Sequence, residues 1–239
     1  MSLEAETCGE IVEPSSSFSL SFSSEFVLLK LIITIQHKQY NLQFTSMQGK
    51  LLIFAAPSGA GKSTIVNFIM QQELNTHFSI SSTTREPRPH ERNGVEYFFI
   101  SKEEFEKAIQ DDEFVEYEEV YSGTYYGSRK SQVERQLQNG ENVVFDVDVN
   151  GAMAIKRHYG DKALSVFIMP PSKEELKKRL INRGTDSLAT IEKRMKRVDY
   201  ELQQAEFFDH VVVNDNLEQA QQKVLALVTD FLNSERCVL

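Results

Sequence analysis

Residues 51–64 of the 239-residue chain read LLIFAAPSGAGKST, and this stretch decides the fold class. Its first six residues form a continuous apolar run, which is typical of a strand buried on both faces of a parallel sheet. Residues 56–63 (APSGAGKS) fit the pattern G-x-x-x-x-G-K-[ST], except that Ala56 takes the place of the first glycine. The stretch therefore predicts a strand, a phosphate-binding loop and a helix in direct succession.

The chemistry of phosphate binding explains the residue types in this loop. Gly59 and Gly61 let the backbone curl so that its N–H groups point at phosphate oxygens. Lys62 supplies positive charge to the β- and γ-phosphates, and Ser63 offers a hydroxyl to Mg²⁺. The loop therefore predicts binding of a nucleoside triphosphate through Ala56, Pro57, Ser58, Gly59, Ala60, Gly61, Lys62, Ser63 and Thr64.

Apolar runs and helix-like stretches alternate along the rest of the chain. Ser172 and Glu175 form a capping box that opens a helix, and residues 191–204 and 217–232 carry apolar side chains at helical spacing. This alternation predicts a doubly wound, three-layer α/β fold with a mostly parallel five-stranded sheet. Besides residues 51–56, the predicted strands are residues 78–80, 143–147, 164–169 and 210–213.

The alternation breaks between residues 81 and 128. Short strands are expected at residues 97–100 and 114–117, around a helix capped by Ser101. We therefore expect a small mixed α+β insertion at residues 81–128, within a core made of residues 47–80 and 129–239.

The first 46 residues differ in composition from the rest and contain no motif. We expect them to be a disordered extension, or sequence upstream of a natural start at Met47. Their most apolar stretch, residues 26–35, is half of the roughly 20 residues that a membrane helix needs, so we expect no membrane association.

Composition narrows the function further. The chain has 35 acidic residues against 26 Lys and Arg, which argues against a nucleic-acid-binding surface. Its two cysteines, Cys8 and Cys237, have no metal-ligand spacing, and we expect free thiols in the cytoplasm.

Several further segments resemble the guanylate kinase family, in its bacterial type. The resemblance covers the chain from about Met47 to its C-terminus, and bacterial members also have alanine at the position of Ala56. It implies ATP-dependent phosphorylation of GMP, and of dGMP, with Mg²⁺ as cofactor. The segments are SSTTREPR (81–88), NGVEYFF (93–99), EFVE (113–116), YYGS (125–128), DVDVNG (146–151), RGT (183–185) and ND (214–215).

Two arginines in the first of these segments suit a phosphate group. Arg85 and Arg88 are three residues apart, and their planar guanidinium groups can bind a phosphate dianion through two hydrogen bonds each. The resemblance implies that they bind the phosphate of GMP together with Tyr97 and Tyr126.

Guanine presents a ring N–H and an amino group side by side, and a carboxylate can accept hydrogen bonds from both. The resemblance assigns this recognition to Glu116 and Asp148, assisted by the hydroxyl groups of Ser81 and Ser128. Asp146 and Asp148 lie two apart on a predicted strand, so both side chains are expected on one face near its carboxyl end. We expect Asp146 to support Mg²⁺ from behind its directly bound ligands.

A helical lid at residues 181–197 is also implied by the resemblance. Arg183 and Arg194 would close over ATP with Arg179 nearby, and Asn214 would lie beside the adenine. The predicted reaction is direct in-line transfer without a covalent intermediate, catalysed by positioning and charge. Its expected catalytic residues are Lys62, Arg85, Arg183 and Arg194.

Two alternatives remain open from the sequence. A kinase for another nucleoside monophosphate would use the same phosphate loop, but the guanine-reading carboxylates would then have no clear partner. A non-catalytic guanylate-kinase-like binding module would typically have a degraded phosphate loop, whereas this loop is complete.

Overall fold

The computed structural model describes residues 48–121, 123–184 and 187–234. The expected N-terminal extension, residues 1–46, lies outside this range. Within the described residues, no helix is both long enough and apolar enough to cross a membrane.

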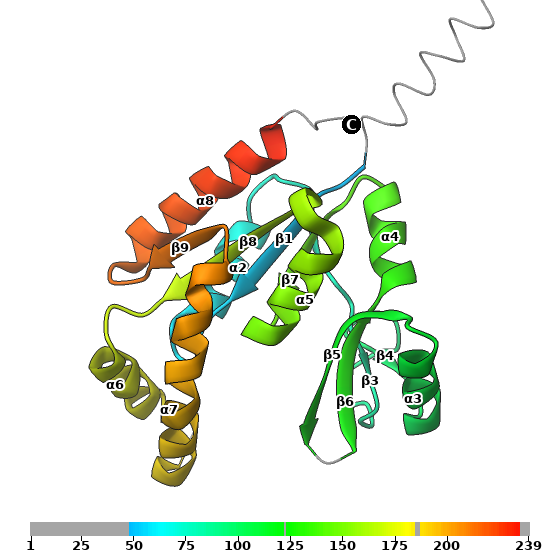
Figure 1. The fold of residues 1–239 in the computed structure, drawn as a ribbon, viewed down its shortest axis with the longest axis horizontal. Coiled ribbons are helices and arrows are strands. Elements are labelled where there is room, and N and C mark those ends of the chain that lie inside the picture. The colour runs from blue at the N-terminus through cyan, green and yellow to red at the C-terminus, as the bar shows by residue number, and fades with distance from the viewer. Residues whose placement is uncertain (1–47, 122, 185–186, 235–239) are drawn as a thin grey trace, which may run out of the picture. The chain divides into compact units, whose positions relative to one another are not determined.

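Five of the described strands form a sheet in the order β2-β7-β1-β8-β9, and every neighbouring pair is parallel (Figure 1). The predicted α/β class and five-stranded sheet are therefore confirmed. One predicted strand was misplaced by two residues: it was expected at residues 78–80, but the strand that pairs with β7 is residues 76–78. The strands are β1 (Leu51–Ala55), β2 (Thr76–Phe78), β7 (Asn142–Asp146), β8 (Ala163–Met169) and β9 (His210–Val213).

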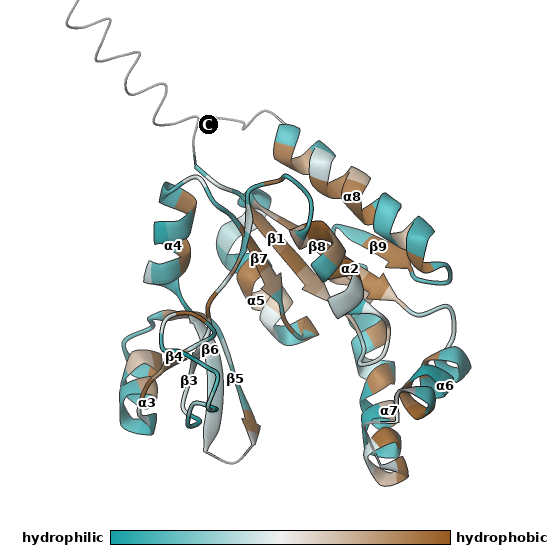
Figure 2. Cartoon of the chain, turned by 180° about the vertical axis from the view of Figure 1, so that it is seen from behind, coloured by the Kyte–Doolittle hydropathy of each residue, from teal (hydrophilic) through white to brown (hydrophobic). Residues whose placement is uncertain are grey.

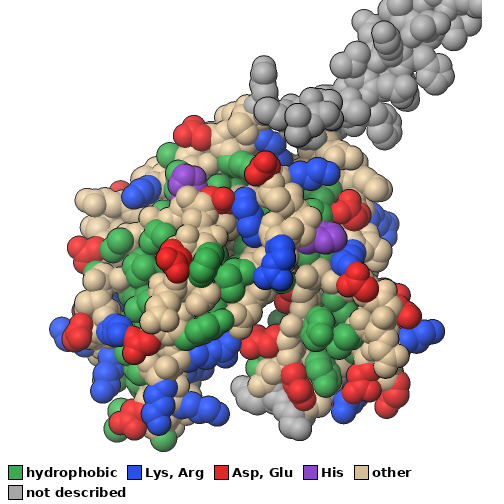
Figure 3. Space-filling view, in the orientation of Figure 1, with side chains coloured by type: hydrophobic (Ala, Val, Ile, Leu, Met, Phe, Trp, Pro, Cys, Tyr) green, Lys and Arg blue, Asp and Glu red, His purple; other side chains and the backbone are tan. Residues whose placement is uncertain are grey.

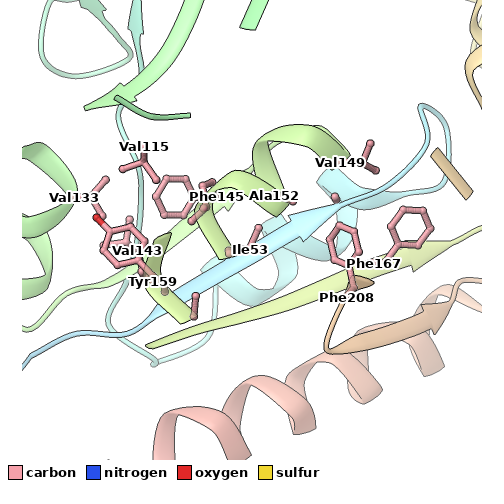
Figure 4. Close-up of a cluster of buried hydrophobic side chains, with 14 of the residues drawn as sticks. Ile53, Val115, Val133, Val143, Phe145, Val149, Ala152, Tyr159, Phe167 and Phe208 are labelled. Carbon is pink, nitrogen blue, oxygen red and sulfur yellow. The ribbon is translucent and has the colours of Figure 1, made fainter. Parts of the chain in front are cut away.

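Helices cover both faces of this sheet. Alternate residues of β1 point to opposite sides: Ile53 packs with α5 and α4 (Figure 4), whereas Phe54 packs with α2 and α8. Figure 2 shows the apolar strands between these two helical layers. The main helices are α2 (Lys62–Met70), α4 (Lys130–Gln138), α5 (Val149–Tyr159), α6 (Lys173–Arg183), α7 (Leu188–Gln203) and α8 (Leu217–Asn233), with short 3₁₀ turns η1 (Gly160–Lys162) and η2 (Gln204–Phe207).

A second sheet is inserted between β2 and β7, which are neighbours in the first. Its strand order is β4-β3-β6-β5, with β3 parallel to β4 and the other pairs antiparallel. The helix α3 covers it through Phe105, whose ring stacks on Phe114 at 4.3 Å and on Tyr125 at 5.3 Å. Its elements are β3 (Ser82–Thr83), β4 (Phe98–Phe99), α3 (Lys102–Gln110), β5 (Phe114–Tyr121) and β6 (Thr124–Arg129).

The helix starts follow the capping chemistry of the sequence. The hydroxyl group of Ser172 accepts a hydrogen bond of 3.1 Å from the Glu175 amide at the start of α6. Ser101 does the same for Glu104 at the start of α3, also at 3.1 Å. Each bond satisfies one of the free N–H groups at a helix start, so the polar residue fixes where the helix begins.

Candidate active site

The phosphate loop joins β1 to α2, as the sequence predicts. Gly59 and Gly61 have φ angles of 93° and 95°, a region that favours glycine. Asn214, which follows β9, donates a hydrogen bond of 2.8 Å to the carbonyl group of Ala60. A Cβ atom on Gly61 would overlap the side-chain amide of Asn214. Gly61 is therefore required both by its backbone conformation and by the close approach of Asn214.

A cavity of about 620 Å³ opens above this loop. Within it, the ammonium group of Lys62 donates a hydrogen bond of 2.7 Å to the Val147 carbonyl and forms an ion pair with Asp146. These contacts hold the lysine at the carboxyl end of β7, beside the start of α2. The cavity is lined by Ala56, Pro57, Ser58, Gly59, Gly61, Lys62, Ser63, Thr64, Asp146, Asp148, Arg179 and Glu201.

The prediction that Asp146 and Asp148 share one strand is wrong. Asp146 is the last residue of β7, whereas Asp148 is the N-cap of α5. Its Oδ1 accepts a hydrogen bond of 2.8 Å from the amide of Gly151, and its Oδ2 lies 3.0 Å from Arg197 Nη2. Aspartate is a strong N-cap, so the chain leaves the strand one residue earlier than the apolar run suggested.

Arg194 of the predicted lid and nearby Arg179 contact the phosphate-loop region. Arg179 donates a hydrogen bond of 3.1 Å to the carbonyl group of Asn214. Arg194 donates one of 2.6 Å to the hydroxyl group of Ser58. The side chain of Arg183 lies outside what the structure describes. Figure 3 shows Lys and Arg side chains gathered over the lower ends of α6 and α7, which carry these residues.

The second sheet brings the predicted phosphate-binding residues together. Arg85 Nε donates a hydrogen bond of 3.1 Å to the hydroxyl group of Tyr126, and the Arg85 guanidinium lies 5.0 Å from the centre of the Tyr97 ring. Arg88 is on the same loop, with 67% of its side chain exposed. Glu91 pairs with Arg85, and this hydrogen-bonded pairing raises the pKa of the arginine.

The predicted guanine-binding residues also meet. The Ser128 hydroxyl group lies 2.7 Å from Glu116 Oε1. Burial raises the pKa of Glu116 to about 7, and the negative charge of nearby Asp148 acts in the same direction. A Cβ atom on Gly151 would lie 3.3 Å from Glu116 Oε2 and 3.4 Å from Asp148 Oδ1. The two carboxylates therefore converge on the start of α5.

A second cavity, of about 420 Å³, lies next to these groups. Its lining includes Ser81 and Tyr97, which precede β3 and β4, Ser128 from β6, and Asp146 from β7. Since Asp146 also lines the cavity above the phosphate loop, the two cavities are adjacent.

Three charged residues near these cavities had no predicted role. Glu91 binds Arg85, and Arg197 binds Asp148 and lies 3.5 Å from Glu118 on β5. Glu201 lines the larger cavity, and burial raises its pKa. Each lies in a stretch rich in charges, where the sequence alone does not separate a buried contact from a solvated one.

Comparison with known proteins decides the family. A family model described as guanylate kinase matches residues 48–231. The chain belongs to the guanylate kinase family. The guanylate kinase of Bacteroides thetaiotaomicron is 54% identical over 198 residues, which is 82% of this chain and 97% of that protein. The guanylate kinase of Porphyromonas gingivalis is 52% identical over 184 residues, which is 77% of this chain and 98% of that protein.

A solved structure supports the same family. The crystal structure of guanylate kinase from Anaplasma phagocytophilum matches with a TM-score of 0.58 and 26% identity, covering 79% of this chain and 88% of that one. The resemblance seen in the sequence is thus confirmed, and with it the enzyme class of a guanylate kinase on a phosphate-loop fold.

Proposed function

We propose that the protein transfers the γ-phosphoryl group of ATP directly to the phosphate of GMP, producing ADP and GDP. The observation that carries this proposal is the adjacency of the two cavities at Asp146, on a chain of the guanylate kinase family. A donor above the phosphate loop and an acceptor beside the second sheet would then meet without an enzyme-bound intermediate. dGMP is expected to serve as a second acceptor.

The acceptor residues can distinguish both ends of GMP. Arg85, Arg88, Tyr97 and Tyr126 supply hydrogen-bond donors and positive charge for its phosphate. At the other end, the carboxylates of Glu116 and Asp148 accept hydrogen bonds from guanine, with the hydroxyl groups of Ser81 and Ser128 beside them. A site built around such specific hydrogen bonds rejects bases that lack the matching groups.

The donor residues neutralise the charge of the transferring group. Lys62 now contacts Asp146 and Val147, and it is expected to turn from them to the phosphates of ATP. Arg194 already contacts Ser58 of the loop, and Arg179 and Arg183 belong to the adjoining helix α6. No general base is required because the attacking phosphate oxygen is already anionic. Catalysis is then positioning together with electrostatic stabilisation.

The donor set of the site suits Mg²⁺. Ser63 and Asp146 both present oxygen atoms to the larger cavity. Among the described residues no group of three or more His, Cys, Asp or Glu is placed to hold a metal ion alone. This pattern fits Mg²⁺, which takes few protein ligands and completes its shell with water and phosphate oxygens. When bound, the ion would neutralise charge on the phosphates of ATP.

The experiment measures ADP release from Mg·ATP with GMP, dGMP, AMP, UMP or CMP as acceptor. Turnover with GMP and dGMP only is the expected result. Comparable turnover with AMP, UMP or CMP would keep the kinase activity and refute the guanine-reading roles of Glu116 and Asp148. Folded protein that binds GMP but turns over none of them would instead be a binding module. We also expect the reaction to take place in the cytoplasm.

A further inference from the structure

Glu91 reaches back along its own loop to the side chain of Arg85. Its Oε2 and Oε1 accept hydrogen bonds of 2.6 and 2.7 Å from Arg85 Nη1 and Nη2. Only 6% of the Glu91 side chain is exposed, and 17% of that of Arg85. A shielded pair with two parallel hydrogen bonds fixes geometry far better than an exposed ion pair does.

Glu91 also fixes the backbone of the loop. Its Oε2 accepts a hydrogen bond of 2.9 Å from the Arg88 amide, and its own amide donates one of 2.9 Å to the Arg88 carbonyl. The hydrogen bonds from Arg85 and then from the Arg88 amide lower the pKa of Glu91 to about 2. The carboxylate is therefore ionised throughout the neutral pH range.

The contacts of Arg85 leave one N–H group of its guanidinium for a ligand. Glu91 occupies the end formed by Nη1 and Nη2, and Nη1 also donates to the Glu86 carbonyl at 2.9 Å. Nε donates to the Tyr126 hydroxyl group. The second N–H of Nη2 has no acceptor within the part of the chain that the structure describes, and it lies on the same edge as Nε–H.

Aromatic rings hold the guanidinium from the side. The centres of the Tyr97 and Phe99 rings lie 5.0 and 5.5 Å from the central carbon of the Arg85 guanidinium. Arg85 is thus confined by Glu91 at its end and by these rings, whereas the side chain of Arg88 is largely exposed. The two arginines of the loop therefore differ in mobility, although the sequence treats them alike.

We propose that Glu91 is a positioning residue for the acceptor phosphate, which it serves by holding Arg85 with its Nε–Nη2 edge toward that phosphate. The inference rests on the proposed function, because the phosphate that Arg85 would bind is that of GMP. Arg88 then supplies the second, movable charge. The phosphate then meets Arg85 beside the Tyr126 hydroxyl group, because Glu91 already occupies the end of the guanidinium formed by Nη1 and Nη2.

The test compares binding of GMP and of guanosine to Glu91→Gln, by calorimetry on the full chain. Guanosine lacks the phosphate, so it reports the guanine contacts alone. Loss of a charge-assisted hydrogen-bonded pair is expected to weaken GMP binding about 10- to 100-fold and to leave guanosine binding within twofold. In steady-state assays KM for GMP rises by a similar factor, while KM for ATP changes little.

Glu86→Gln is the matched control. Glu86 lies on the same loop with an exposed side chain, so the substitution removes the same charge but keeps the backbone carbonyl that accepts a hydrogen bond from Arg85. GMP binding to this variant should stay within twofold of that to the unmodified protein.

Three outcomes would overturn the proposal. Equal weakening of GMP and guanosine by Glu91→Gln would show that Glu91 only supports the fold. Unchanged GMP binding would show that Arg85 needs no positioning, and tighter binding would show that Glu91 competes with the phosphate. Because these are binding measurements, they remain decisive even if the unmodified protein fails to phosphorylate GMP, a result that would refute the proposed function separately.

Discussion

Ser128 and Glu116 pair across neighbouring antiparallel strands, and the Ser128 hydroxyl group lies 2.7 Å from Glu116 Oε1. This bond favours the ionised carboxylate, yet burial outweighs it and raises the pKa of Glu116 to about 7. The group proposed to accept hydrogen bonds from guanine therefore changes its charge near neutral pH.

The first prediction concerns this titration. We expect kcat/KM for GMP to rise about tenfold between pH 6 and pH 8, because only the ionised carboxylate accepts hydrogen bonds from both guanine groups. A group with a pKa near 7 passes from about one-tenth to about nine-tenths ionised over this interval. Initial rates at saturating Mg·ATP measure the effect.

The control for this prediction is Glu116→Gln, whose amide does not titrate. The phosphate of GMP itself ionises near pH 6, and this contribution remains in the variant. A pH profile of the unmodified protein that runs parallel to that of the variant would contradict the role of Glu116.

The second prediction concerns Gly151, the residue between the two carboxylates. Gly151→Ala would place a methyl group 3.3 Å from Glu116 Oε2 and 3.4 Å from Asp148 Oδ1. We expect KM for GMP to rise about tenfold, as for other well-placed steric intrusions of one carbon, with KM for ATP unchanged. Since alanine favours a helix over glycine, the melting temperature should not fall. An unchanged KM for GMP would show that guanine does not bind next to Gly151.

The third prediction compares two glycines with positive φ angles, Gly61 and Gly160. Gly61→Ala combines φ strain with overlap on the Asn214 amide, so ATP binding should weaken more than tenfold by distortion of the phosphate loop. Gly160→Ala has φ of 54° and ψ of −125°, which residues other than glycine rarely adopt, but open space around the added carbon, so it should lower the free energy of unfolding by about 1–3 kcal/mol and leave activity unchanged. ATP titrations and thermal unfolding of both variants provide the measurement, and equal ATP binding by the two would contradict it.

The fourth prediction concerns stability away from the cavities. Asp209 Oδ2 accepts hydrogen bonds from the amide and hydroxyl groups of Ser165, each of 2.8 Å, and pairs with Lys156 at 2.8 Å. Asp209→Ala should lower the free energy of unfolding at pH 7 by about 1–3 kcal/mol, because buried donors lose their acceptor. Urea unfolding measures the loss, and kcat should not change.

The pH dependence of this loss has a definite sign. Burial alone would raise the pKa of Asp209, but the bonds from Lys156 and Ser165 outweigh it and lower the pKa. The stabilisation is therefore complete above the unfolded pKa of about 4 and disappears as the pH falls through the lower folded value. Asp161→Ala, at an exposed position, is the control. An equal loss in both variants would refute the role of Asp209.

The fifth prediction concerns residues 1–46. Every residue of the candidate site follows Met47, so a chain that starts there should keep the kcat and both KM values of the full chain. A large fall in kcat, in a truncated chain that is still folded, would assign these residues a part in catalysis.

Much of the fold could be predicted because parallel strands are recognisable in the sequence as continuous apolar runs. The runs at β1, β7, β8 and β9 are apolar on both faces, and serine residues mark the starts of α3 and α6. By contrast, β3 and β6 have no apolar run, because β3 consists of two buried polar residues, Ser82 and Thr83, and β6 reads TYYGSR. Nothing in their local sequence distinguished them from loops.

The candidate site was predicted less completely, for a related reason. Motifs identified the phosphate loop, Arg85 and Glu116, whose residue types follow directly from the ligand. The contacts of Glu91 and Arg197 depend on the path of the chain in three dimensions and were not foreseen. Asp148 was predicted to lie on a strand because an apolar run leads up to it. In the structure it instead accepts the capping hydrogen bond from the Gly151 amide and begins a helix.

The second sheet leaves the core after β2 and returns at β7, and these two strands are neighbours. Ser79 and Ile80, just before the inserted segment 81–128, line the same cavity as Ser128 at its end, so the two attachments of this segment lie close together. Of the residues proposed to bind GMP, only Asp148 lies outside it. A change of the nucleotide that receives the phosphoryl group would therefore require rewriting this one stretch together with Asp148, while the phosphate loop stays as it is.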